Sequence, residues 1–77
     1  MSRRPGIISF MNEELRGKRV TIVGNDFEAS GVFVSADSHM NIVLDKAMVR
    51  DSDTEALHGR IVVRGANIRY VVIHDGF

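Results

Sequence analysis

Apolar residues follow a helical period at the start of the chain. The spacing of about three to four positions holds for Ile7, Ile8, Met11 and Leu15. The opposite side of such a helix holds Asn12, Glu13, Glu14 and Arg16. This pattern predicts a short amphipathic helix over about residues 6–16. Pro5 suits a first helical turn and Gly17 a C-terminal stop.

Beyond Gly17 the period changes to that of strands. Val20 and Ile22 alternate with their neighbours, and residues 24–26 (Gly-Asn-Asp) tolerate the positive φ of a hairpin turn. The run from Phe27 then alternates until Gly31, after which both parities become apolar. A glycine inside a strand often marks a bulge or a sharp bend, so we expect a bent second strand.

The rest of the chain predicts three further strands. After the polar stretch 36–39, a third strand is indicated by alternating apolar positions at Met40, Ile42 and Leu44. The charged run 50–55 has no periodicity and predicts a surface loop. Apolar runs at 61–63 and 68–73 flank a short turn at 64–67 and predict strands four and five.

The last two strands do not alternate cleanly, which is typical of strands covered on both faces. So short a chain cannot supply all of that cover itself, and exposed apolar edges invite pairing with another chain. We therefore expect an oligomer joined through edge strands four and five. The alternative is a barrel that closes on itself as a monomer, as small SH3-like domains do.

Composition narrows the classes of protein further. With 77 residues the chain allows one domain with a small core, and without cysteine it has no disulfide, thiolate zinc site or cysteine nucleophile. Ten basic residues balance ten acidic ones, so any nucleic-acid site must be local. The first residues carry no apolar signal core, and no run approaches the ~20 apolar residues of a membrane span. We expect an intracellular protein.

Catalytic and metal-binding patterns are missing from the sequence. It contains no Gly-rich phosphate loop, and no nucleophile with a recognisable base. Its three histidines, His39, His58 and His74, lack the spacing of metal ligands. We therefore expect a protein that is not an enzyme and uses no metal or cofactor.

Two segments, 31–44 and 59–68, resemble the two signature motifs of the Sm/LSm family. The first has a strand glycine, then Asp-x-His-Met-Asn and a leucine; the second has an apolar strand, Arg-Gly and a β-branched residue three positions on. The stretch 64–75 is similar to the same region of eukaryotic D-type Sm proteins. Ala66 and His74 depart from the family pattern, which commonly has a small polar or acidic residue and, in the D-type, a proline there.

The resemblance covers nearly the whole chain and implies a fold. That fold is mainly β, with an N-terminal helix followed by a five-stranded, strongly bent antiparallel SH3-like barrel. It would form a single Sm domain over residues 1–77. Its parts would be the helix, a first motif at about 19–47, a variable loop at about 48–58 and a second motif at about 59–74.

The resemblance also implies an RNA site, because family members build one nucleotide pocket per subunit from two loops. Carried over to this chain, the RNA-binding residues are His39, Asn41 and Arg64, with Asp37 and Gly65 shaping the loops. An imidazole and a guanidinium plane can sandwich any base, whereas an amide can match the O4 and N3–H groups of uracil. Arg64 could alternatively pair with Asp37 on the surface.

Ala66 bears on base selectivity. A freely rotating Asn41 amide would read cytosine as well as uracil, and an acidic residue at position 66 could hold that amide, whereas Ala66 cannot. We therefore predict weaker selectivity for uridine, unless Asp37 or a backbone group holds Asn41 instead. U-over-C discrimination equal to or better than that of an Ala66→Asp variant would reject weaker selectivity.

The implied function is that of a subunit of an Sm/LSm ring that binds single-stranded U-rich RNA. In a eukaryotic hetero-heptamer this means small nuclear RNP assembly, pre-mRNA splicing or mRNA decay, in the nucleus, the cytoplasm or both. Two alternatives stay open: an archaeal-type homo-oligomeric RNA-binding protein, and a ring or scaffold subunit that acts mainly through protein–protein contacts.

Overall fold

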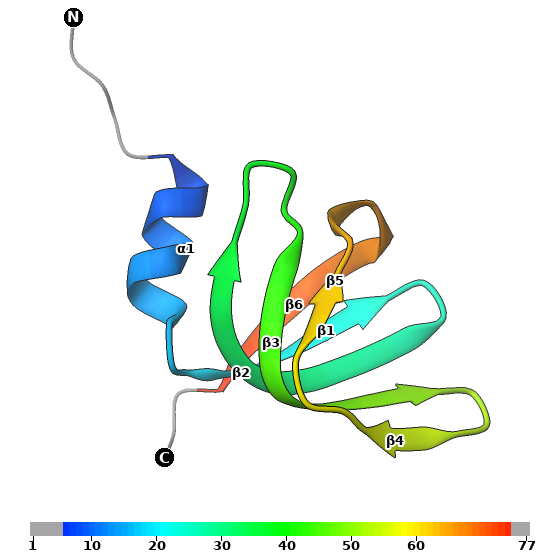
Figure 1. Ribbon diagram of the computed structural model, residues 1–77. Coiled ribbons are helices and arrows are strands. Elements are labelled where there is room, and N and C mark those ends of the chain that lie inside the picture. The colour runs from blue at the N-terminus through cyan, green and yellow to red at the C-terminus, as the bar shows by residue number, and fades with distance from the viewer. Residues whose placement is uncertain (1–5, 75–77) are drawn as a thin grey trace, which may run out of the picture.

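The computed structural model describes residues 6–74 and shows one helix followed by a bent antiparallel sheet (Figure 1). In chain order the elements are α1 (Ile7–Leu15), β1 (Arg19–Gly24), β2 (Phe27–Ala36), β3 (Ile42–Asp51), β4 (Glu55–Leu57), β5 (Ile61–Val63), the 3-10 helix η1 (Gly65–Asn67) and β6 (Ile68–His74). The strand order is β4-β3-β2-β1-β6, and β5 pairs with β3 off this path. This architecture confirms the predicted fold class.

Helix α1 forms where the apolar period predicted it. Met11 and Leu15 are buried against the sheet, and Gly17 follows the helix with a φ of 82°, a left-handed conformation that favours glycine. Pro5, the predicted helix start, lies outside the described residues. Asn12 was assigned to the polar side of the helix, but it is half-buried and faces β2, so that assignment was wrong.

The hairpin between β1 and β2 lies at the predicted position but turns differently. Neither Asn25 nor Asp26 has a positive φ; among the described residues only Gly17, Met40 and Lys46 do. Gly24 is required for another reason, because a Cβ there would collide with the ring of Phe27. The interpretation of this segment as a positive-φ turn was therefore wrong.

Strand β2 bends at Gly31, as predicted. Its register with β3 shifts between Ser30 and Val32, and again between Phe33 and Ser35. A Cβ at Gly31 would lie 2.7 Å from the carbonyl oxygen of Asp45, so only glycine lets the two strands approach so closely at this point. The bend folds one long strand into two arms of the barrel (Figure 1).

The predicted loop over residues 50–55 is mostly strand. β3 runs on to Asp51 and pairs with β4, which leaves only residues 52–54 as a turn. One carboxylate oxygen of Asp51 accepts bonds from the backbone N–H groups of Asp53 and Thr54 and from the Thr54 hydroxyl. The charged run misled the prediction because a ribbon exposed on both faces needs no apolar period, and its turn is closed by a side chain.

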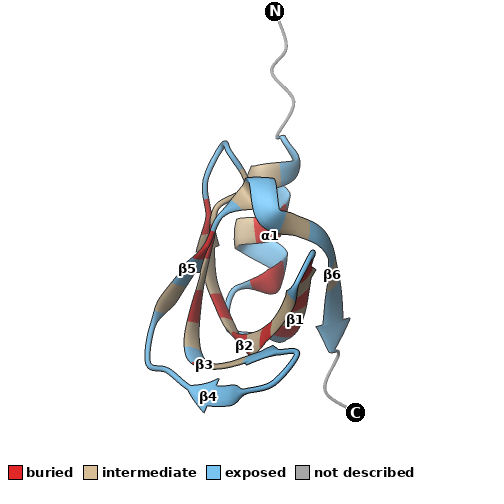
Figure 2. Cartoon of the chain, turned by 90° about the vertical axis from the view of Figure 1, so that its right-hand side faces the viewer, coloured by how far each residue is buried: buried red, intermediate tan, exposed pale blue. Residues whose placement is uncertain are grey.

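The barrel stays open on one side. Its buried core joins the helix to the inner faces of the strands and consists of Met11, Leu15, Val20, Ile22, Ala29, Phe33, Ala36, Ile42, Leu44, Ala47 and Val63. Within the described residues no pairing joins β5 to β6, so each has a free edge. Figure 2 shows β6 and β4 as mostly exposed strands. The cover that the pattern of the last strands predicted is absent from the single chain.

Candidate nucleic-acid interface

The loop between β2 and β3 and the turn between β5 and β6 meet at one rim of the barrel. They enclose an open hollow, here called the rim hollow, with a volume of about 670 Å³. Its lining consists of His39, Met40, Asn41, Arg64, Gly65 and Ala66. The structure thus brings together the residues that the two sequence motifs predicted, from segments more than twenty positions apart.

Asp37 ties the first loop into a closed knot. Its Oδ1 accepts the backbone N–H of His39 at 2.8 Å and that of Asn41 at 3.0 Å. Across the base of the loop, the Met40 N–H bonds the Asp37 carbonyl at 2.9 Å, and Met40 takes a φ of 63°. The N–H groups of Asn41, first in the backbone and then in the side chain, lower the pKa of Asp37 because they stabilise its charged form.

Asn41 links the two loops through its side-chain amide. Its Oδ1 accepts the backbone N–H of Gly65 at 2.8 Å, and its Nδ2 donates to Oδ2 of Asp37 at 3.0 Å. A donor on one side and a carboxylate on the other distinguish the amide oxygen from the nitrogen. The Asn41 amide is therefore held in one orientation by both groups that the sequence reasoning named as substitutes for an acidic residue 66.

Gly65 allows the close approach of the two loops. A Cβ at this position would collide with the carbonyl oxygen of His39 and lie 2.9 Å from the carbonyl carbon of Met40. These are backbone atoms, which cannot move aside as the end of a long side chain can. The shaping role predicted for Gly65 thus has a steric basis, and the same contact leaves its N–H pointing at Asn41.

His39 and Arg64 are exposed and line the rim hollow from opposite loops. Among residues 6–74 the ion pairs join Arg50 to Glu28 and Arg60 to Asp45. Arg64 therefore does not pair with Asp37, the surface pairing that the sequence left open. Its planar cation lines the hollow, where it can stack on a flat ligand.

Asn12 supports the rim and was missed as a positioning residue. From helix α1 its Nδ2 donates to the Ala36 carbonyl at 3.1 Å, and its Oδ1 accepts the Ala36 N–H at 2.8 Å. This pair fastens the end of β2 to the helix, one residue before Asp37. The available signal was an asparagine next to Met11, at the border of the apolar stripe.

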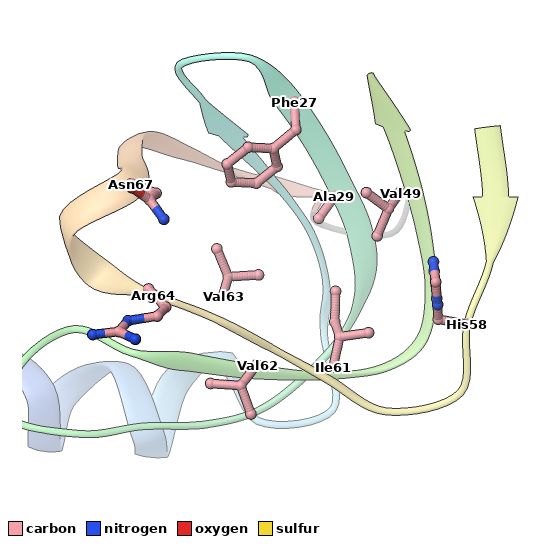
Figure 3. Close-up of a pocket in the computed structure, with 9 residues that line it drawn as sticks. All are labelled: Phe27, Ala29, Val49, His58, Ile61, Val62, Val63, Arg64 and Asn67. Atoms are coloured by element: carbon pink, nitrogen blue, oxygen red, sulfur yellow. The ribbon is translucent and has the colours of Figure 1, made fainter. Parts of the chain in front are cut away.

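A second hollow, the apolar pocket, opens at the unpaired side of the barrel (Figure 3). It has a volume of about 290 Å³ and is lined by Phe27, Ala29, Val49, His58, Ile61, Val62, Val63, Arg64 and Asn67. Phe27, Ile61 and Val63 face into it, whereas the Arg64 guanidinium points away. Aliphatic and aromatic side chains dominate its wall, so the surface beside β5 is suited to cover by other apolar groups.

Two classes of alternative site have no support in the described part of the chain. No cluster of three or more His, Asp or Glu side chains there could hold a metal ion. The single α-helix over Ile7–Leu15 is far shorter than a bilayer requires.

The family model described as "LSM domain" matches residues 10–73, and the chain belongs to this family. A protein of Pyrococcus horikoshii provisionally described as an snRNP Sm-like protein is 33% identical over 69 residues, which cover 88% of this chain and 89% of the relative.

Two solved archaeal structures share the fold. The heptamer of SmAP1 from P. aerophilum has a TM-score of 0.78 at 26% identity and covers 95% of this chain and 100% of that one. The Sm protein of Pyrococcus abyssi, solved in complex with a uridine heptamer, has a TM-score of 0.75 at 26% identity and covers 94% and 100%. The resemblance found in the two sequence motifs is thereby confirmed.

Proposed function

We propose that this protein is a subunit of an Sm-type ring that binds single-stranded, U-rich RNA, one base per subunit, in the rim hollow. The observation that carries the proposal is the Asn41 amide, held in one orientation by Asp37 and Gly65 at the floor of a hollow that also holds an imidazole and a guanidinium. The uridine heptamer bound to the Pyrococcus abyssi relative supports the same choice of ligand.

The chemistry of the hollow divides affinity from selectivity. His39 and Arg64 offer planar groups on which an unstacked base can stack, a contact worth about 1–3 kcal/mol per base that accepts any base. Selectivity then depends on Asn41. After its bonds to Gly65 and Asp37, its Nδ2 still has one N–H and its Oδ1 one lone pair, which match the O4 and N3–H of uracil.

The free edges of β5 and β6 support assembly into a ring. Beside the apolar pocket, Val62 is 62% exposed, and Tyr70, Val72 and Ile73 on β6 are also exposed. Pairing the β6 of one subunit with the β5 of the next would satisfy both edges and cover these side chains. The heptameric relative from P. aerophilum supports such a ring, and the uncovered strands disfavour a self-closed monomer.

We further propose a homo-oligomeric ring with a general RNA-binding role, which the archaeal relatives favour. A second candidate is a subunit of a eukaryotic-type hetero-heptamer in small nuclear RNP assembly, pre-mRNA splicing or mRNA decay, in the nucleus or the cytoplasm. The D-type-like stretch 64–75 favours this second candidate. In both cases the proposed protein is intracellular, works by binding and performs no catalysis.

Native mass spectrometry of the purified chain, alone and with oligo-U or oligo-C, tests the proposal. A closed ring of about six to eight copies that prefers oligo-U supports the homomeric reading. Aggregated or low-order species that form rings only with other Sm subunits would support the heteromeric one. A stable monomer indifferent to both RNAs would overturn the proposal.

A further inference from the structure

The hydrogen bonds of Asn41 define a pattern that more than one base can satisfy. The floor of the rim hollow offers one N–H from Nδ2 beside one acceptor lone pair on Oδ1, in a fixed order. A base that fits must present an acceptor beside a ring N–H. Uracil does so with O4 and N3–H, and guanine does so with O6 and N1–H. Cytosine and adenine present the reverse order.

The hollow is roomy enough for the larger of these two bases. Its volume of about 670 Å³ lies within the range of pockets that hold a whole drug-sized ligand, about 300–1,000 Å³. Ala66 lines it with a side chain that ends at Cβ and is exposed. No bulky residue at position 66 therefore restricts the hollow to a single six-membered ring.

The side chains of the hollow also do not reject the remaining edge of guanine. Next to the matched pair, uracil has the O2 acceptor and guanine a 2-amino group. Met40, Gly65 and Ala66 carry no side-chain nitrogen or oxygen, and His39 and Arg64 are engaged in stacking under the proposed function. No side chain is left to distinguish O2 from the amino group, and the larger face of a purine stacks at least as well.

We propose that the rim hollow accepts guanine as well as uracil and excludes cytosine and adenine, so that the chain recognises single-stranded RNA containing both U and G. The inference rests on the proposed function, because it concerns the same site. It extends the ligand class from one base to the two RNA bases that share this edge.

The test uses heptanucleotides in which four identical test bases alternate with abasic positions. This design, in lithium buffer, prevents base pairing and guanine quadruplexes. Fluorescence anisotropy measures the affinity of the assembled protein for the U, G, C and A strands, with oligo-U as reference. We expect the U and G strands to bind within about threefold of each other, and the C and A strands at least about tenfold more weakly.

Two variants separate the causes. Ala66→Leu narrows the hollow and should weaken the G strand at least about fivefold more than the U strand. Asn41→Asp offers acceptors only and should weaken both strands, because a carboxylate repels O4 and O6 alike. Equal weakening of U and G by Ala66→Leu would contradict the steric argument.

The outcomes distinguish the inference from the function on which it rests. If oligo-U does not bind at all, the proposed function fails. If the U strand binds and the G strand is as weak as the C strand, only the inference is overturned. If all four strands bind equally, the Asn41 amide does not select bases and the inference is also overturned.

Discussion

The rim hollow and the β5/β6 edges differ in how much of their bonding the single chain satisfies. At the rim, Asp37, Asn41 and Gly65 bond one another, and the loops are in place before any ligand arrives. At the edges, two strands lie unpaired with exposed apolar side chains. Recognition chemistry is therefore preorganised within one subunit, whereas the barrel is completed only by its neighbours.

The largest effect should come from blocking an edge. Val62→Lys places a charge on the exposed face of β5 beside the apolar pocket, where a neighbouring strand would have to bury it. We expect rings to dissociate into monomers by native mass spectrometry. Affinity for oligo-U should fall by ~10²–10⁴-fold, because contacts on separate subunits no longer act together.

The matched control is Ile7→Lys on helix α1. Ile7 is 66% exposed and Val62 is 62% exposed, so both changes add one lysine at a similarly open site. The helix variant should keep the ring and its RNA affinity. Intact rings with Val62→Lys would show that β5 is not an assembly edge.

A smaller effect should follow from separating the two loops of the rim. Gly65→Val puts a side chain into the His39 carbonyl, so the turn must move away and Asn41 loses its bond to the backbone N–H. Affinity for oligo-U should drop by about 10–100-fold, equivalent to losing stacking of about 1–3 kcal/mol per base. The ring should persist in native mass spectrometry.

Gly59→Val serves as the control for this change, because a Cβ at Gly59 meets nothing within 4 Å. It should leave RNA binding near that of the parent protein. Should both glycine variants bind equally well, the contact between the two loops would not be what organises the site.

Acid should open the first loop at a pH set by Asp37. The folded protein lowers the pKa of this carboxyl below 3.8, so the stabilisation by its ionised form is fully present above 3.8 and is lost as pH falls through the lowered pKa. The NMR amide signals of His39 and Asn41, which donate to Asp37, should report this transition. In Asp37→Asn the transition should vanish; its persistence would assign it to another group.

The smallest effect should come from a region that belongs to neither side of the comparison. Arg60 bonds both carboxylate oxygens of Asp45 at 3.0 and 2.9 Å, and the pair lies exposed to solvent. Arg60→Gln should leave the free energy of unfolding unchanged within the error of a denaturant titration, because solvent screens such a pair. A clear loss of stability would show that the pair helps to hold β5 on β3.

Much of the fold could be predicted because local patterns carry it. The helical spacing of Met11 and Leu15, the alternation around Val20 and the bend at Gly31 each report which side of an element is buried. The hairpin over residues 48–57 escaped prediction because both of its faces are exposed, which leaves no period to detect. Asn12 escaped because its partner, Ala36, is a backbone group distant in sequence.

By itself the sequence determined the family, the fold class and the residues gathered at the rim, since two motifs and a hydrophobic period are written along the chain. Only the tertiary structure decided how Asn41 is oriented, because its two partners come from different loops and a hydrogen bond depends on distance and direction. It also decided that β5 and β6 stay unpaired in one subunit, because strand pairing is a contact in space rather than a pattern in sequence.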